Sequence, residues 1–280
     1  MDHSKPTLVL GGTGKTGRRV VERLVARGVP TRVGSRRGEP PFDWHDRATW
    51  APAVRGTRAV YVSYHPELAV PGAADTVGAF AEVAVGSGVP RLVLLAGLGE
   101  PEAEMAEEAV AATGAALTIV RCAWFAQNFS EDYLLEHVLG GEVRVPGGDA
   151  RVPFVDAGDI ADVAVAALTD DRHAGRLYEL TGPRALTFGE AVGEIARAAG
   201  QDVRYRSVSF EQHAAESIEH GAPDEVIELL TYLFSVLRSG RMARLGDGVQ
   251  RAIGREPRDF ADFARDAAAT GVWDSPAVAA

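Results

Sequence analysis

A glycine-rich turn between an apolar run and an amphipathic segment constrains this chain more than any other feature. Residues 8–10 are apolar, and the apolar residues after the turn recur at helical spacing: Val20, Val21, Leu24 and Val25. Strand, tight turn and helix in this order are the context that a dinucleotide-binding turn requires. An ordinary structural turn is the alternative, and this context favours the binding turn over it.

The three glycines of the turn, Gly11, Gly14 and Gly17, follow a GxxGxxG pattern. One glycine permits backbone angles denied to other residues, one lets the backbone approach a pyrophosphate, and one lets the helix pack closely on the strand. Phosphates are then expected at the helix N-terminus, where free N–H groups and the helix dipole favour negative charge. The predicted cofactor contacts of the turn are Gly11, Thr13, Gly14, Lys15, Thr16 and Gly17.

The stretch after the second predicted strand, Thr31–Gly34, indicates which dinucleotide is bound. The strand ends in Ser35, Arg36 and Arg37, and the next carboxylate is Glu39. An acidic residue at this place binds a free ribose 2′-hydroxyl, whereas arginine suits a 2′-phosphate. We therefore predict NADP(H) rather than NAD, bound by these three residues. A pair of solvated surface arginines is the alternative interpretation.

Alternating strand and helix patterns predict an α/β protein with a doubly wound parallel sheet (Rossmann), followed by a smaller, mostly helical C-terminal substrate region. Residues 1–150 are expected to form the NADP-binding domain, with strands extending to about 185, and residues 151–280 a mixed, intertwined region. Within that region, residues 152–156 are predicted to form a strand and Asp159 to cap a helix. Thr187 and Glu190 have the spacing of a capping box, and Pro223 is predicted to start a helix.

Ligands bind at the carboxyl ends of strands in open parallel sheets, which makes the residues there site candidates. Ser63 and Ala96 end two predicted strands and are assigned to the cofactor. Tyr64 and His65 follow Ser63 and are expected to face cofactor or substrate, Tyr64 as a proton donor. The run Trp124, Phe125 and Asn128 combines aromatic walls with an amide after another strand, as a substrate pocket does. Surface positions are the alternative for Tyr64 and His65.

Composition excludes several classes of protein. A net charge of −10 argues against a nucleic-acid-binding surface, and no apolar run approaches the length needed to cross a bilayer. The N-terminus lacks the apolar core of a signal peptide. The single cysteine, Cys122, excludes an internal disulfide and a cysteine-based metal cluster, and its apolar surroundings favour a buried filler over a nucleophile. We expect a cytoplasmic protein that binds a small molecule and no metal, and leave a homo-oligomer open.

Taken together, these motifs resemble the NmrA-like branch of the atypical short-chain dehydrogenase/reductases. The similarity lies in the glycine turn, in Arg36, in Arg121-x-x-Trp-Phe-x-x-Asn-Phe129 and in Phe154-Val-Asp-x-x-Asp159, and it covers residues 7 to about 273. Within the branch, Gly-Gly-Thr-Gly-Lys-Thr and Gly254-Arg-x-Pro-Arg-x-Phe260 resemble bacterial relatives of the festuclavine and agroclavine synthases of ergot-alkaloid secondary metabolism. The resemblance implies the Rossmann fold and NADP(H), and says less about the substrate.

One departure from the wider superfamily matters for function. Ordinary short-chain dehydrogenases use a Tyr-x-x-x-Lys pair, but the corresponding segment here, residues 100–110, contains neither residue. Glu108 stands where several NmrA-like quinone reductases have lysine. Most glutamates of this segment are expected to be solvated on the surface.

Two interpretations follow from the missing pair. The protein is an NADPH-dependent reductase of a small electrophile (an imine or iminium ion, a quinone or an enone), or it binds NADP(H) without turnover as a redox-sensing regulator. The pocket-like segment after Cys122 favours the enzyme, and a non-redox lyase or isomerase on the same scaffold is a weaker third alternative.

Overall fold

The computed structural model describes residues 4–274 of the chain. They form two compact units, and the chain passes between them several times. Residues 4–122, 157–180 and 246–256 make the first unit; residues 123–156, 181–245 and 257–274 make the second. No helix within the described residues is long and apolar enough to span a bilayer.

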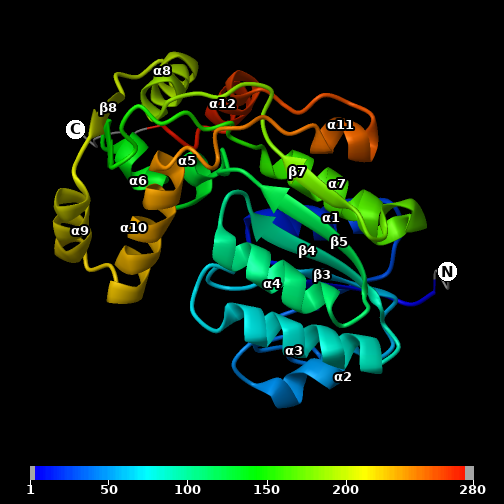
Figure 1. The fold of residues 1–280 in the computed structure, drawn as a ribbon. Helices are drawn as coiled ribbons and strands as arrows, with labels where there is room; N and C mark the ends of the chain where they lie inside the picture. The colour runs from blue at the N-terminus through cyan, green and yellow to red at the C-terminus, as the bar shows by residue number, and fades with distance from the viewer. Residues whose placement is uncertain (1–3, 275–280) are drawn as a thin grey trace. The chain divides into compact units, whose positions relative to one another are not determined.

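A six-stranded parallel sheet organises the first unit (Figure 1). Its strand order is β2-β1-β3-β4-β5-β7, so β2 lies on one side of β1 and β3 on the other. Open sheets bind ligands at such a reversal, which here lies at the carboxyl ends of β1 and β3. The predicted doubly wound parallel fold is confirmed. The strands are β1 (Thr7–Leu10), β2 (Thr31–Gly34), β3 (Ala59–Val62), β4 (Arg91–Gly97), β5 (Ala116–Cys122) and β7 (Leu177–Leu180).

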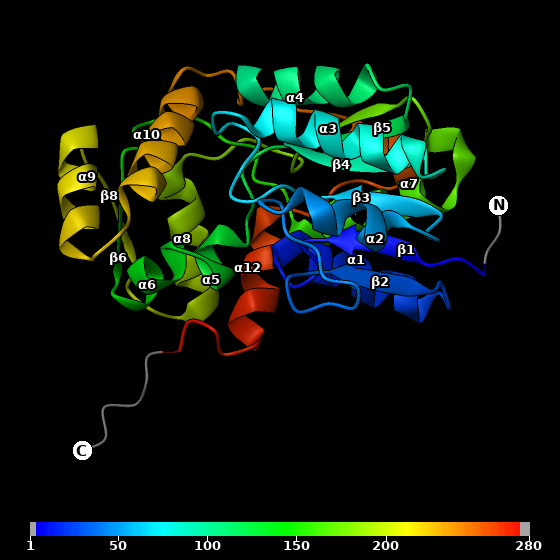
Figure 2. The ribbon, with the colours of Figure 1, turned by 90° about the horizontal axis from the view of Figure 1, so that it is seen from below.

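Helices cover both faces of this sheet. α3 and α4 pack together on one face and α1 and α7 on the other, while the short α2 lies against α3 (Figure 2). The strands read as near-continuous apolar runs because both of their faces are buried. The helices of the unit are α1 (Lys15–Ala26), α2 (Trp50–Val54), α3 (Ala73–Gly86), α4 (Pro101–Ala111), α7 (Ala157–Thr169) and α11 (Gly248–Ile253), with 3₁₀ turns η1 (Arg47–Thr49) and η2 (Asp171–His173).

An aromatic cluster anchors the loop between β2 and α2. The Trp44 ring meets Phe42 edge-on at 4.9 Å and Phe80 of α3 at 5.2 Å. Trp50 is 1% exposed, and its Nε1 donates to the Asp43 carbonyl at 2.8 Å. Such edge-to-face aromatic pairs add packing energy beyond their buried area, so the loop is held against the core.

The predicted capping role of Asp159 is wrong. α7 begins at Ala157, so Asp159 lies inside its first turn, where it is completely buried. Its carboxylate accepts a hydrogen bond from the Arg255 guanidinium at 2.7 Å, and the same arginine binds Asp162. The Asp159 carboxylate therefore forms an ion pair with Arg255, a residue distant in sequence, instead of capping the helix as its local sequence predicted.

The second unit is mostly helical. It contains one two-stranded parallel sheet of β6 and β8, which the sequence did not predict. Residues 152–156, predicted as a strand, make only isolated bridges at Val152 and Val155, because Pro153 has no N–H for a ladder. The elements are α5 (Asn128–Glu131), α6 (Leu134–Leu139), β6 (Glu142–Val145), α8 (Phe188–Ala199), β8 (Arg204–Ser207), α9 (Phe210–Glu219), α10 (Asp224–Arg238) and α12 (Phe260–Ala269).

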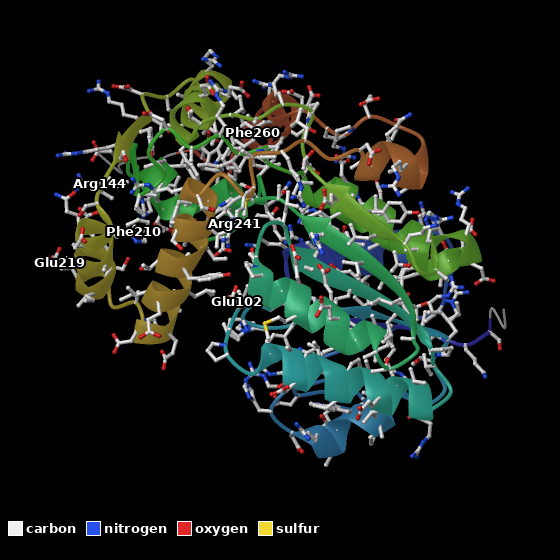
Figure 3. The ribbon with its side chains drawn as sticks, viewed as in Figure 1. Glu102, Arg144, Phe210, Glu219, Arg241 and Phe260 are labelled. Atoms are coloured by element: carbon white, nitrogen blue, oxygen red, sulfur yellow. The ribbon has the colours of Figure 1, made fainter. Side chains whose placement is uncertain are left out.

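Local helix-start signals in this unit are confirmed. Thr187 and Glu190 form a complete capping box at α8, and α10 begins directly after Pro223. Ser209 and Gln212 form a second capping box at α9, whose first residue, Phe210, is labelled in Figure 3. Helix starts of this kind can be predicted from sequence, because the residues that form them are only a few positions apart.

A buried ion pair joins β5 to α4 in the first unit. Arg121 donates two hydrogen bonds to Glu107, whose side chain is 5% exposed, and it also approaches Glu104 and Glu179. Removing one member of such a pair leaves a buried charge without compensation, which is costly.

We expect Arg121→Met to lower the free energy of unfolding by about 3 kcal/mol, measured by urea denaturation. Glu104→Gln is the matched control, because Glu104 is the exposed partner of the same arginine. It is expected to change stability by less than about 1 kcal/mol. Equal effects of the two variants would contradict this account of the pair.

Candidate functional site

The glycine turn has the geometry of a phosphate-binding turn. Gly11 has a left-handed φ of 65°, and its carbonyl accepts the Gly14 N–H at 2.9 Å. A Cβ at Gly17 would collide with the Gly11 carbonyl, so only glycine lets α1 approach the turn this closely. A Cβ at Gly14 would meet nothing nearer than the Gly11 oxygen at 3.3 Å. Gly14 therefore presents open backbone at the start of α1.

The N-terminus of α1 is suited to an anion. Gly14 is its N-cap, makes no side-chain cap, and the first turn carries no acidic residue. The N–H groups and dipole of a 12-residue helix remain available there, with Lys15 and the exposed Thr13 beside them. The Thr16 side chain is buried and accepts a hydrogen bond from Tyr61 at 3.0 Å, so only its backbone could serve a ligand. This donor set fits a pyrophosphate.

The segment after β2 presents two arginines. The Ser35 carbonyl accepts the N–H groups of Gly38 (3.0 Å) and Phe42 (2.9 Å), which closes the loop. Arg36 and Arg37 are exposed, and neither guanidinium has a hydrogen-bond or ion-pair partner among residues 4–274. An unpaired arginine fork directly after the second strand fits a ribose 2′-phosphate.

The strand-end candidates differ in accessibility. Ser63 is half-buried and faces the glycine turn: a Cβ at Gly11 would lie 3.3 Å from the Ser63 Oγ. Tyr64 is half-buried with its ring 5.0 Å from that of Trp44, and His65 is exposed. The Ala96 side chain is 4% exposed and packs into the core, which leaves only its backbone at the sheet edge.

The pocket candidates Trp124, Phe125 and Asn128 belong to the second unit. Trp124 is 7% exposed, with its ring 5.0 Å from Phe234 and 6.1 Å from Phe188. Phe125 and Asn128 are half-buried. The Trp124 indole lies beside the Tyr133 hydroxyl.

Sequence analysis missed two further polar groups of this aromatic cluster. His213 of α9 is 4% exposed and lies 5.6 Å from the Phe234 ring, and its Nδ1 has no partner. The Tyr133 hydroxyl is buried beside the Trp124 indole: burial raises the pKa of Tyr133 well above its usual value, while the indole acts to lower it. Burial lowers the pKa of His213, with the neighbouring His137 acting in the same direction. Unpaired polar atoms on aromatic walls are features of ligand pockets, and no local sequence pattern reveals them.

Sequence analysis also missed the burial of two glutamates in the segment expected to be solvated. Glu107 is the ion-pair partner of Arg121, whereas Glu100 is 4% exposed and its Oε2 has no partner. Burial, and then the charges of Glu67 and Glu102, raise the pKa of Glu100 well above its usual value. Figure 3 shows Glu102 at the start of α4. The signal that could have found Glu100 is its place three residues after the end of β4.

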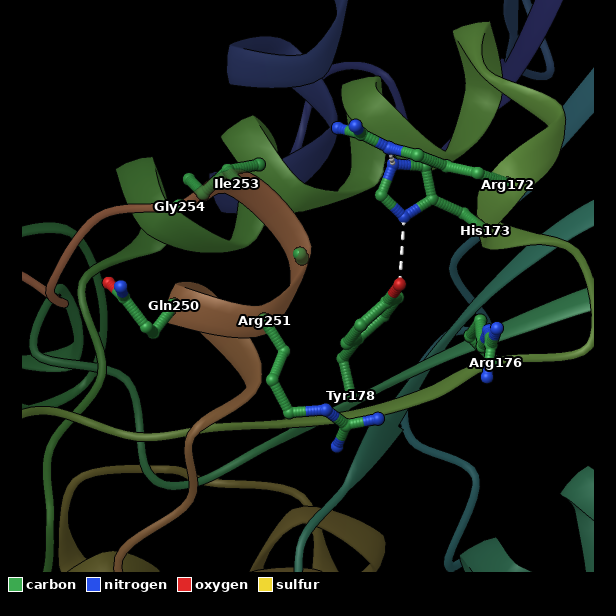
Figure 4. A pocket seen from close by; sticks show the side chains of 9 residues that line it. Arg172, His173, Arg176, Tyr178, Gln250, Arg251, Ile253 and Gly254 are labelled. Atoms are coloured by element: carbon green, nitrogen blue, oxygen red, sulfur yellow. Dashed lines mark hydrogen bonds between the residues drawn. The ribbon is translucent and has the colours of Figure 1, made fainter.

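A separate pocket of about 540 Å³ lies beside β7, the edge strand of the six-stranded sheet. It is formed by the start of β7, by η2 and by α11, and lined by Arg172, His173, Arg176, Tyr178 and residues 250–254 (Figure 4). The His173 Nδ1 is hydrogen-bonded to the Tyr178 hydroxyl at 2.9 Å. Because this pocket lies at the amino end of β7, it is not part of the candidate cofactor site at the carboxyl ends of β1 and β3.

Comparison with known proteins gives the family. No family profile matches the chain. It is 31% identical to the NAD(P)H azoreductase of Xenophilus azovorans, covering 94% of this chain and 98% of that protein. It is 32% identical to the (4-alkanoyl-5-oxo-2,5-dihydrofuran-3-yl)methyl phosphate reductase of Streptomyces griseus (92% and 96% covered). The agroclavine dehydrogenase of Claviceps fusiformis is 29% identical (92% and 96% covered).

Solved structures share the fold. The Citrobacter sp. triphenylmethane reductase complexed with NADP(H) superposes with a TM-score of 0.76 at 19% identity, covering 94% of this chain and 99% of that one. The transcriptional regulator NmrA superposes with a TM-score of 0.68 at 15% identity (95% and 98% covered). The chain belongs to the NmrA-like atypical short-chain dehydrogenase/reductases.

The raised pKa of Glu100 has a consequence for stability. A carboxyl group whose pKa is higher in the folded state stabilises the fold at low pH, and this contribution is lost as pH rises above its ordinary value of 4.5. We expect Glu100→Gln to flatten the pH dependence of the unfolding free energy between about pH 5 and pH 8. Urea denaturation across this range measures it. A Glu100→Gln curve parallel to that of the parent would contradict the assignment.

Proposed function

We propose that this protein is an NADPH-dependent reductase that transfers hydride to a small electrophile, namely an imine or iminium ion, a quinone or an enone. The observation that carries the proposal is the uncapped α1 N-terminus together with the unpaired Arg36 and Arg37 after β2. The first fits a pyrophosphate and the second a 2′-phosphate.

The protein is an oxidoreductase, and NADP(H) is its cofactor. When bound, the nicotinamide of NADPH supplies a hydride. The glycine turn and Lys15 would hold the pyrophosphate, and Arg36 and Arg37 the 2′-phosphate. Ser63 and the Ala96 backbone lie at the carboxyl ends of β3 and β4, where they would contact the cofactor. The role of these residues is to bind and orient the cofactor, which lowers the barrier by proximity.

The proposed class of substrate is inferred from the residues that are missing from α4. The helix contains no tyrosine and no lysine, so the acid pair that assists carbonyl reduction in ordinary short-chain dehydrogenases is absent from it. An iminium ion is already electrophilic and needs no proton on the reacting atom, whereas conjugated quinones and enones need only a proton after hydride addition. Tyr64, His65, Trp124, Phe125 and Asn128 are the proposed substrate contacts, with Tyr64 and Asn128 nearest the chemistry.

The relatives' names are consistent with such acceptors. They refer to an azo compound, an alkanoyl-oxo-dihydrofuran phosphate and agroclavine. None of the three names refers to a simple secondary alcohol.

A non-catalytic redox sensor is the second candidate function. The missing Tyr and Lys also suit a protein that binds NADP(H) without turnover, and the regulator NmrA has the same fold. The aromatic cluster around Trp124, which contains the buried His213 with an unpartnered Nδ1, favours the enzyme, because aromatic walls with a few polar groups suit a substrate.

We expect Arg36→Ala to remove most of the preference for NADPH over NADH, because the guanidinium binds a phosphate that NADH lacks. The preference is expected to fall by about tenfold or more, measured by fluorescence titration with both cofactors. Arg27→Ala is the matched control, because Arg27 is an exposed arginine at the other end of α1 and should leave both affinities unchanged. Equal affinities of the parent for NADPH and NADH would contradict the phosphate assignment.

We expect NADPH consumption with cyclic imines, quinones or enones, and slow or no oxidation of simple secondary alcohols by NADP⁺. Absorbance of NADPH measures both reactions. Robust alcohol oxidation would show that residues outside α4 perform the role of the missing tyrosine and lysine. Tight NADPH binding without turnover on any acceptor would instead support the sensor.

A further inference from the structure

The pocket beside β7 is lined by positive charge in an acidic protein. The lining contains three arginines and no carboxylate, although the chain has a net charge of −10. Arg172 lies in η2, Arg176 directly before β7, and Arg251 in α11 (Figure 4). Guanidinium groups that face one cavity from two walls repel one another, so an anion bound between them is stabilising.

One of the three guanidinium groups has no counter-charge. Arg172 lies 3.2 Å from the Asp170 carboxylate, and Arg251 lies 3.4 Å from that of Asp247. The Arg176 side chain is exposed and makes no hydrogen bond or ion pair with any residue from 4 to 274. Arg176 therefore keeps all of its N–H donors for a ligand.

The terminal N–H groups of Arg172 are available as well. Its Nε donates to the His173 Nε2 at 3.2 Å, and the same Nε is the atom that approaches Asp170. Within the described part of the chain, no hydrogen bond uses its Nη1 or Nη2 group. Two N–H groups of one guanidinium can bind two oxygens of the same phosphate or carboxylate.

A chain of hydrogen bonds leaves the Tyr178 hydroxyl as a further donor. Because the Arg172 guanidinium can only donate, the His173 Nε2 accepts, and the neutral ring carries its hydrogen on Nδ1. This Nδ1 donates to the Tyr178 hydroxyl at 2.9 Å (Figure 4). The hydroxyl's own hydrogen has no acceptor among the residues that the structure describes, so it is available to a ligand in the pocket. Burial lowers the pKa of His173, and the charge of Arg172 acts in the same direction, which agrees with a neutral ring.

This part of the lining is fixed in place by the sheet. His173 is 1% exposed, and its carbonyl accepts a hydrogen bond from the Thr118 hydroxyl of β5 at 2.7 Å. Its neighbour in η2, Asp171, forms an ion pair with Arg91 of β4. The Tyr178 side chain is 5% exposed. A donor that is already held in position loses little conformational entropy when a ligand binds.

We propose that this pocket binds a small phosphate ester, separately from NADP(H). The phosphate would accept hydrogen bonds from Arg172, Arg176 and the Tyr178 hydroxyl. Donors on three side chains suit the three terminal oxygens of a phosphate better than the two oxygens of a carboxylate. The proposal uses no residue of the candidate cofactor site and does not depend on the reductase function.

The size of the pocket indicates an ester rather than a bare phosphate ion. Its volume of about 540 Å³ is in the range of cavities that hold whole small molecules. The organic part of the ligand would lie against residues 250–254 of the α11 wall, which offer the Gln250 amide and the apolar side chains of Ala252 and Ile253.

Isothermal titration calorimetry tests the proposal on protein loaded with one equivalent of NADP⁺, so that the cofactor occupies its own site. The probes are ribose 5-phosphate, inorganic phosphate, ribose and succinate. Ribose 5-phosphate should bind once per chain and more tightly than inorganic phosphate or succinate, and ribose should not bind.

Two variants assign this binding to the pocket. Arg176→Gln removes the unpaired guanidinium, and Tyr178→Phe removes the hydroxyl while keeping the ring. Each should weaken ribose 5-phosphate binding by about tenfold or more, because each removes a hydrogen bond to a charged group. The affinity for NADP⁺ should not change. Arg55→Gln is the matched control, because Arg55 is an exposed arginine of the same unit that does not line the pocket.

Each outcome decides the proposal. Binding of ribose 5-phosphate that both pocket variants weaken and the control does not supports it. No binding to the parent protein overturns it, and so does binding of succinate or inorganic phosphate with equal affinity. Unchanged binding in Arg176→Gln, or equal weakening in Arg55→Gln, would place the ester elsewhere and also overturn it. Because Arg176 is exposed, its variant keeps the test decisive even where Tyr178→Phe does not fold.

Discussion

The contact between α1 and the glycine turn is the constraint on which the candidate site depends. Gly17 lies against the Gly11 carbonyl with no room for a Cβ, and this brings the uncapped end of α1 over the end of β1. Any larger residue would move the helix and, with it, the N–H groups at its N-terminus. The adjacent Thr16–Tyr61 hydrogen bond ties the same turn of α1 to β3. Close packing of α1 on the glycine turn thus positions the backbone N–H groups proposed to bind the cofactor.

The segment after β4 differs from that of ordinary short-chain dehydrogenases, because α4 contains neither tyrosine nor lysine. In those enzymes a lysine lowers the pKa of a tyrosine donor, whereas here burial and a neighbouring carboxylate raise the pKa of Glu100.

Much of the fold was predictable because its signals are local. The glycine turn, the capping box at Thr187 and the helix start at Pro223 each depend on residues a few positions apart. The burial of Asp159 and Glu100 was not predictable, because it is decided by partners and packing from distant segments. The sheet of β6 and β8 was missed for the same reason: each strand has four residues, and their pairing spans about 60 positions of the chain. The site candidates follow the same rule: the glycine turn and Arg36 are recognised from local sequence, whereas the contacts of Phe234 with Trp124 and His213 join distant segments.

The central claim is that the protein passes hydride from NADPH to an electrophile rather than sensing the cofactor. It is tested most directly by isotope transfer. NADPH carrying deuterium at the reactive C4 position would be incubated with the protein and a quinone or an enone, and the product analysed by mass spectrometry and NMR. The account predicts one deuterium per product molecule in the enone product and matching oxidation of NADPH. Tight binding of the labelled cofactor with no oxidation and no label in any product would contradict it.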